Sequence, residues 1–118
     1  MKKPIMLAIL GVLASATPTL SAEICRAPMV PQLPINGAVI THDQLMSAAD
    51  QVSIFSKSNT SYKTCLDAVI TQPANVTREK WREALRAYNQ TAPTEQAIWG
   101  AYEKLSGDWV VANQVRSN

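Results

Sequence analysis

Three side chains in this sequence could carry reactive chemistry by their type: the two cysteines, Cys25 and Cys65, and the single histidine, His42. A pair of thiols can form a disulfide, take part in redox exchange or bind a metal ion. Redox pairs favour close spacing such as C-x-x-C, and a metal needs more ligands than two thiols and one imidazole. We therefore predict that Cys25 and Cys65 form one structural disulfide.

His42 lies in the first turn of a predicted helix, where we expect it to be exposed. No second histidine and no nearby acid–nucleophile pair accompanies it in the sequence. The sequence also lacks a Gly-rich phosphate loop, a GxSxG motif and a carboxylate or histidine cluster with metal spacing. We therefore predict a protein that is not an enzyme, with no catalytic residue, no metal and no cofactor.

Residues 1–22 have the composition of a signal peptide. A positive start, Met1 to Lys3, precedes an apolar run from Ile5 to Ala14 that is too short to span a bilayer comfortably. We predict cleavage near residues 21–22; the alternative is a membrane anchor that is never cut. The Lys-Lys start is typical of bacterial chains, so the predicted location is the periplasm. Residues 23–118 then form a single small domain.

The net positive charge of the chain comes from this predicted signal. The sequence has 11 Lys and Arg residues against nine Asp and Glu, and two of the 11 are Lys2 and Lys3. The remaining nine basic residues balance the nine acidic ones, which gives no global attraction to nucleic acid or anionic membranes. We predict no nucleic-acid partner and no stable membrane insertion after cleavage.

The longest regular pattern runs from Thr41 to Ile70. Its residues recur every seven positions in two rows, as in the a and d rows of a helical seam. The rows are Leu45, Val52, Asn59 and Leu66, and Ala48, Phe55, Tyr62 and Val69. Thr41 and Gln44 form a capping box at the start of this helix. Asn59 interrupts the first row, and it either fixes the register of a helix pair or faces solvent.

A second helical pattern runs from Arg78 to about Ala112. Its rows are Trp81, Tyr88, Tyr102 and Trp109, with Glu95 in the gap, and Ala84, Ile98, Leu105 and Ala112. Pro93 removes one backbone hydrogen bond, yet the pattern keeps its phase across it. This favours a kinked helix, and the alternative is a break into a third helix. The short connection around Pro73 makes the two helices antiparallel neighbours.

A basic ridge of Arg78, Arg82 and Arg86 on the second helix could grip phosphates or lipid head groups. Glu79 and Glu83 are interleaved with it, at pairing distance from Arg82 and Arg86. We therefore predict a solvated face on which the glutamate charges balance the arginine charges.

Residues 27–37 carry a proline at every third position from Pro28 to Pro34, the period of polyproline II. We expect an extended strip whose apolar residues, Met29, Val30, Leu33 and Ile35, cover a groove between the helices; the alternative is a proline-rich ligand for a recognition domain. The predicted fold is all-α, a long antiparallel two-helix hairpin with the second helix kinked or broken at Pro93. The N-terminal proline-rich segment is extended and pinned to the hairpin by one disulfide.

The combination of Cys25, the following prolines with Gly37, Phe55 and the Tyr62-x-x-Cys65-Leu66 element resembles a group of small exported proteins from alphaproteobacteria. The resemblance covers essentially the whole mature chain. It implies a helical hairpin with a disulfide, and it implies no activity.

The apolar residues exceed what one seam between two helices needs. Trp99, Leu85 and Val110 lie outside the rows, and we predict that they contact another envelope protein or a second copy of the chain. The predicted function is a non-enzymatic periplasmic protein-binding protein, or an accessory or structural subunit of a cell-envelope assembly. The alternative is a small periplasmic chaperone or stress protein.

Overall fold

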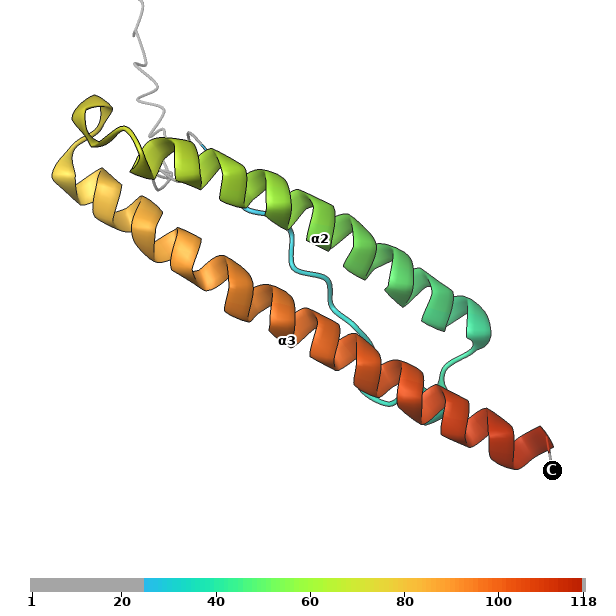
Figure 1. Cartoon of the computed structure of the whole chain (residues 1–118). Coiled ribbons are helices and arrows are strands. Elements are labelled where there is room, and N and C mark those ends of the chain that lie inside the picture. The colour runs from blue at the N-terminus through green and yellow to red at the C-terminus, as the bar shows by residue number, and fades with distance from the viewer. Residues whose placement is uncertain (1–24, 118) are drawn as a thin grey trace, which may run out of the picture.

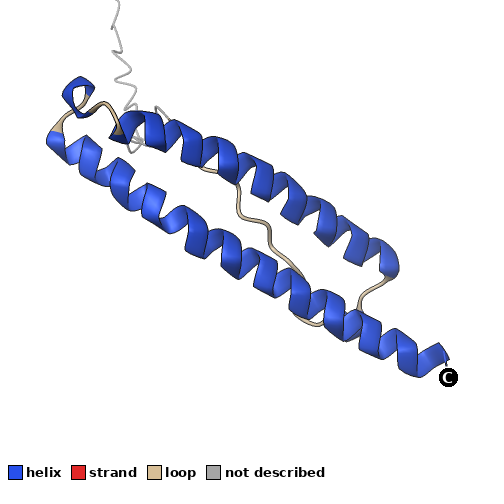
Figure 2. Ribbon diagram, viewed as in Figure 1, coloured by secondary structure: helices blue, strands red, loops and turns tan. Residues whose placement is uncertain are grey.

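The computed structural model describes residues 25–117, and the predicted signal peptide lies outside this range (Figures 1 and 2). Two helices, α2 (His42–Ile70) and α3 (Arg78–Ser117), form an antiparallel pair. Short 3-10 turns, η1 (Gly37–Val39) and η2 (Pro73–Asn75), precede each helix. The extended segment of residues 26–36 crosses one side of the pair. The predicted all-α hairpin with a pinned N-terminal segment is confirmed.

Side-chain caps set the beginning of both helices. Gln44 N donates to Thr41 Oγ1 at 3.1 Å, and Thr41 N donates to Gln44 Oε1 at 2.8 Å, which completes the predicted capping box. Lys80 N donates to Thr77 Oγ1 at 3.2 Å in the same way at α3. These hydrogen bonds satisfy backbone N–H groups that have no partner within the helix.

α3 is one continuous helix that passes through Pro93 and ends later than predicted, at Ser117 instead of about Ala112 (Figure 1). The alternative of a separate third helix is therefore wrong. Gly107 does not break the helix, because Leu105 beside it is buried in the core and Lys104 Nζ bonds Asp108 Oδ2 at 2.8 Å one turn apart. At about 1.5 Å per residue, α2 is roughly 43 Å long and α3 roughly 60 Å.

The predicted seam forms the core. Val52 and Leu66 on α2 are fully buried, and Ala84 and Leu105 on α3 are buried as well. The buried residues form two clusters, one at each end of the hairpin. One end holds Cys25, Leu66 and Ala84; the other holds Leu45, Ala48 and Leu105. The seven-residue rows therefore identified the buried face of each helix.

The proline-rich segment covers less of the groove than predicted. Met29 and Ile35 point to solvent, with exposed fractions of 91% and 89%, and Val30 is half exposed. Of the four apolar residues, only Leu33 packs on the core. The physical reason is the threefold period of an extended proline-rich chain, which turns one residue in three toward the helices. Pro28 and Pro31, three residues apart, are partly buried; after Pro31 the period breaks, so that Leu33 is partly buried and Pro34 is exposed.

The predicted arginine ridge is solvated, but it is not paired as expected. Among residues 25–114, whose side chains the structure describes, the ion pair is Lys104–Asp108. The predicted Glu79–Arg82 and Glu83–Arg86 pairs are therefore wrong. Ion pairs between exposed side chains contribute little to the free energy of folding. The charged groups of these glutamates and arginines can therefore stay hydrated by water instead of pairing.

Candidate functional site

The disulfide joins Cys25 to Cys65 as predicted, with an S–S distance of 2.04 Å and a Cα–Cα distance of 5.6 Å. Both cysteines of the sequence are thereby used. Cys25 is buried beside Leu66 and Ala84, so the bond fixes the start of the extended segment against both helices. A structural disulfide of this kind is typical of a chain that folds in an oxidising compartment.

His42 has a packing contact. Its side chain is exposed, as predicted, and its ring lies 5.3 Å from the Trp109 ring, centroid to centroid. In the part of the chain that the structure describes, no three His, Cys, Asp or Glu side chains gather where they could hold a metal ion. Within residues 25–117, neither helix combines the length and apolarity that crossing a membrane requires.

Three contacts between the helices mark one side of the hairpin. Trp81 Nε1 donates to the Ile70 carbonyl at 2.9 Å. Lys63 Nζ lies 5.4 Å from the centroid of the Tyr88 ring, in cation–π geometry. Ser56 Oγ donates to Glu95 Oε1 at 2.5 Å. At 100° per residue, Ser56 and Lys63 lie about 180° and 160° around α2 from Cys65, which holds the extended segment. We call the side of the pair that carries Ser56 and Lys63 the open side.

Trp99, one of the predicted contact residues, flanks the open side. It is 40% exposed and meets Tyr102 edge to face, with ring centroids 6.1 Å apart. Leu85 is partly buried and Val110 is 41% exposed. At 100° per residue, Leu85 and Val110 lie within about 40° of Trp99 around α3, but about 21 Å and 17 Å from it along the axis. The three residues thus share one face of α3 and form a stripe instead of a compact cluster.

A polar layer crosses the middle of the seam. Asn59 is only 4% exposed, and its Nδ2 donates to the Thr91 carbonyl at 3.1 Å, so of the two alternatives the one in which it faces solvent is wrong. Thr91 is equally buried, and its Oγ1 donates to the Tyr88 carbonyl at 2.7 Å. Thr91 is missing from the predicted row, although it lies seven residues after Ala84 and seven before Ile98.

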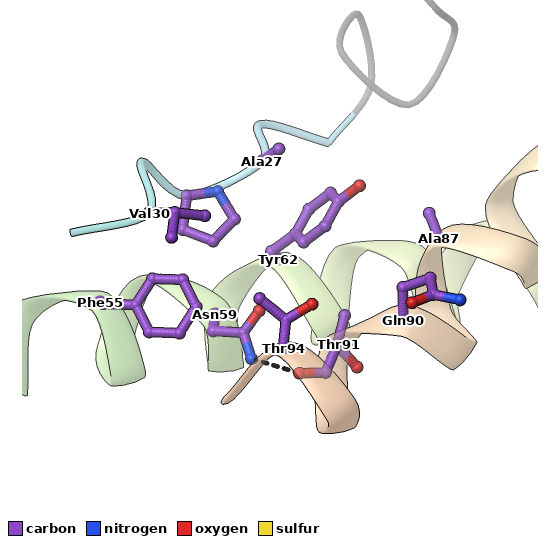
Figure 3. A pocket seen from close by; sticks show the side chains of 10 residues that line it. Ala27, Val30, Phe55, Asn59, Tyr62, Ala87, Gln90, Thr91 and Thr94 are labelled. Carbon is purple, nitrogen blue, oxygen red and sulfur yellow. Dashed lines mark hydrogen bonds between the residues drawn. The ribbon is translucent and has the colours of Figure 1, made fainter. Parts of the chain in front are cut away.

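A cavity of about 170 Å³ lies beside this layer, between the extended segment and the two helices (Figure 3). The segment contributes Pro28 and Val30, α2 contributes Phe55, Asn59 and Tyr62, and α3 contributes Gln90 and Thr94. Its walls are therefore mostly apolar, with a few polar groups, Asn59 on α2 and Gln90 and Thr94 on α3 among them. The sequence analysis missed this cavity, because it depends on the path of the segment across the helices and on no sequence motif.

No family model, curated protein or solved structure matches this chain. Its resemblance to the alphaproteobacterial group stays a prediction. The function must therefore be argued from the disulfide, the open side and the cavity.

Proposed function

We propose that this protein is a non-enzymatic, protein-binding subunit of a cell-envelope assembly and works in the periplasm. The observation that carries the proposal is the 40% exposed Trp99, which shares one face of α3 with Leu85 and Val110 on the open side of the hairpin. Large aromatic side chains left at a surface mark contact sites, and tryptophan is enriched among the residues that dominate binding energy.

The shape of the stripe favours an amphipathic helix as the partner. Leu85, Trp99 and Val110 are spread along nearly 40 Å of α3 on one face, which suits an elongated ligand. A third helix commonly packs along a pair of antiparallel helices. Lys63 and Glu95 lie at the open side and supply both signs of charge there. The occupant we propose is a helix of another envelope protein.

The disulfide supports the location. A reducing cytoplasm keeps cysteine thiols in the reduced, unbonded form. Cys25 and Cys65 form a disulfide here, and this bond fixes the segment to the core. The predicted signal peptide at residues 1–22, which lies outside the described residues, is the second argument for export.

Trp99→Ala tests the proposal. We expect the variant to keep its helical circular dichroism and lose about 30-fold in affinity for the partner, because truncating a central Trp typically costs 2 kcal/mol or more. The measurement is capture from periplasmic extract at equal bait concentration, followed by reciprocal capture with the recovered protein. Val111→Ala is the matched control, since Val111 is exposed on another face of α3.

Two outcomes contradict the proposal. One is equal loss of capture by Trp99→Ala and Val111→Ala. The other is a stoichiometric complex that forms as well without the Trp99 ring as with it. Light scattering on the purified protein identifies a third outcome, a dimer that dissociates on Trp99→Ala, which makes a second copy the occupant in place of another protein.

A small periplasmic chaperone is the second candidate, and a different surface favours it. Met29 is almost fully exposed and Ile54 is 65% exposed, on the rim of a shallow groove between the segment and α2. Methionine adapts its shape to varied apolar ligands. For this function, the protein should suppress aggregation of several unrelated unfolded clients, and Met29→Ser, not Trp99→Ala, should weaken that effect. The chaperone function is excluded if the protein captures one defined partner and does not suppress the aggregation of unfolded clients.

A further inference from the structure

We infer that the cavity under the extended segment binds a small planar molecule with an apolar ring and one hydrogen-bond donor, the chemistry of a phenol. This site lies between the helices and the proline-rich segment, so it is independent of the open side and goes beyond the proposed protein-binding function.

The acceptor for such a donor is the side-chain carbonyl of Asn59. Its Nδ2 is held by the Thr91 carbonyl at 3.1 Å, which leaves Oδ1 directed toward the cavity (Figure 3). No described residue donates to Oδ1. Among the described side chains, no polar atom is both sealed from the surroundings and unpaired, so Oδ1 keeps some accessible surface, and Asn59 lines the cavity. An amide oxygen on a residue that is only 4% exposed gains from a donor that enters with a ligand.

The size and lining of the cavity fit one ring. Its volume is about 170 Å³. An engineered apolar cavity of about 150 Å³ in another protein holds benzene, which sets the scale. Pro28, Val30 and Phe55 supply apolar walls, and Gln90 and Thr94 add polar groups on the α3 side. Mostly apolar walls with a few placed polar groups are the usual composition of a small-molecule site.

The covalent frame explains why the cavity stays open. The disulfide fixes Cys25 three residues before Pro28, and the rings of Pro28 and Pro31 restrict the backbone of the segment above the cavity. A flexible strand could settle into the gap, whereas this one is held across it. A wall that is already ordered reduces the entropy lost when a ligand binds.

Phenol and toluene are matched probes, because they differ only by a hydroxyl in place of a methyl group. Titrated into the disulfide-bonded protein and followed by amide chemical shifts in NMR, phenol should give saturable changes at residues 55–62 and 87–94. Toluene should bind about tenfold more weakly, the equivalent of 1.4 kcal/mol. Absence of saturable changes with phenol, or equal affinity for the two probes, overturns the inference.

Two variants separate the site from general surface binding. Asn59→Leu removes the acceptor and should abolish the preference for phenol over toluene. Because Asn59 also bonds α3, that variant could fail to fold, so Ala87→Leu, which fills the cavity from α3 and leaves the polar layer intact, is the second test. It should lower phenol affinity at least tenfold, while Ala101→Leu, on an exposed part of α3, should not. Unchanged binding by Ala87→Leu contradicts the site.

Discussion

Gly37 determines how closely the chain before α2 approaches α3. A Cβ at this position would overlap with the Leu105 carbonyl oxygen and lie 3.0 Å from Asp108 Cβ. No glycine among the described residues has a positive φ, so the requirement here is for space and not for an unusual backbone conformation. Asn36 holds the turn in place by accepting a hydrogen bond from Ala38 N at 3.0 Å. The turn thus rests directly on the backbone of α3.

Gly37→Ala should destabilise the protein by about 1–3 kcal/mol, because the backbone of α3 cannot move aside as a flexible side chain can. For a domain of this size, each kcal/mol lowers Tm by about 4–8 °C. Gly107→Ala is the matched control: a Cβ there meets nothing within 4 Å, so the change should stabilise the helix by about 0.5–1 kcal/mol. Thermal unfolding followed by circular dichroism measures both. Shifts of the same sign in the two variants would show that the close contact is not maintained.

Asn59 illustrates how a buried polar residue can specify an alignment. A slip of one heptad, about 10 Å along the helix, would place Asn59 beside the Ala84 or Ile98 layer in place of Thr91. Its amide would then lose the Thr91 carbonyl and be buried without that partner. An apolar residue at the same row would tolerate the slip. We therefore interpret Asn59 as the residue that selects one register of the hairpin.

At the scale of elements, the heptad rows carried most of the predictive information. They located α2 and the buried face of both helices, because a buried helical face must repeat with the period of the helix. The cap at Thr41 was predicted separately, from the capping box that it forms with Gln44. The end of α3 was misjudged, since Gly107 weakens local helix propensity while the tertiary contacts of Leu105 and Trp109 outweigh it. Local sequence does not encode such contacts.

The candidate site was less predictable than the fold. The exposure of Trp99 was predictable, because a large apolar residue outside the seam rows is not covered in a two-helix hairpin; its role as a contact residue stays a prediction. The cavity was not recognised, since its walls come from three separate elements and Pro28 and Val30 contribute to it only through the path of the segment. The exposure of Met29 was likewise missed, because the rotation of an extended strip around its own axis is set by its few anchoring points.

The disulfide should supply a large share of the stability of the hairpin. Bridging Cys25 and Cys65 closes a loop of 40 residues in the unfolded chain, which corresponds to about 3–4 kcal/mol in the chain-entropy model. We expect the double variant Cys25→Ser, Cys65→Ser to melt more than about 10 °C below the parent protein. Its helical circular dichroism should persist at low temperature, because Val52 and Leu105 do not depend on the bond.

Thiol labelling is the companion measurement. The native parent should present no reactive thiol, and labelling should appear only after reduction. A double variant that melts within about 2 °C of the parent would mean that the segment is held by its other contacts, such as that of Leu33 with the core.

At the scale of the whole molecule, the hairpin is uneven along its length. α3 has 40 residues against 29 in α2, and Trp109 already lies beside His42 at the first turn of α2. The last turns of α3 therefore project past the start of its partner (Figure 1). Isolated helical turns without a packed face have little stability of their own in water.

Hydrogen exchange should reveal this difference. Backbone amides after Asn113 should exchange at least a hundredfold faster than those of residues 84–105, a gap of roughly 3 kcal/mol in opening free energy. The measurement is exchange followed by mass spectrometry on overlapping peptides, with residues 52–66 of α2 as the protected reference. Equal protection at both places would indicate that the end of α3 is packed in solution, by a second copy if the protection rises with protein concentration.

The two cysteines also determine how the protein matures. In a chain exported from its N-terminus, Cys25 enters the oxidising compartment forty residues before Cys65, so the first thiol waits there without an intramolecular partner until most of α2 has followed. A chain with two cysteines has one possible intramolecular pairing, and no wrong bond within the chain can form and need correction. Maturation thus requires an oxidant but no disulfide isomerase. The same property leaves the waiting Cys25 thiolate open to exchange with a small-molecule disulfide, which releases a small thiol, or to oxidation with the thiol of another copy by the same oxidant. The yield of native protein should therefore depend on how soon Cys65 arrives.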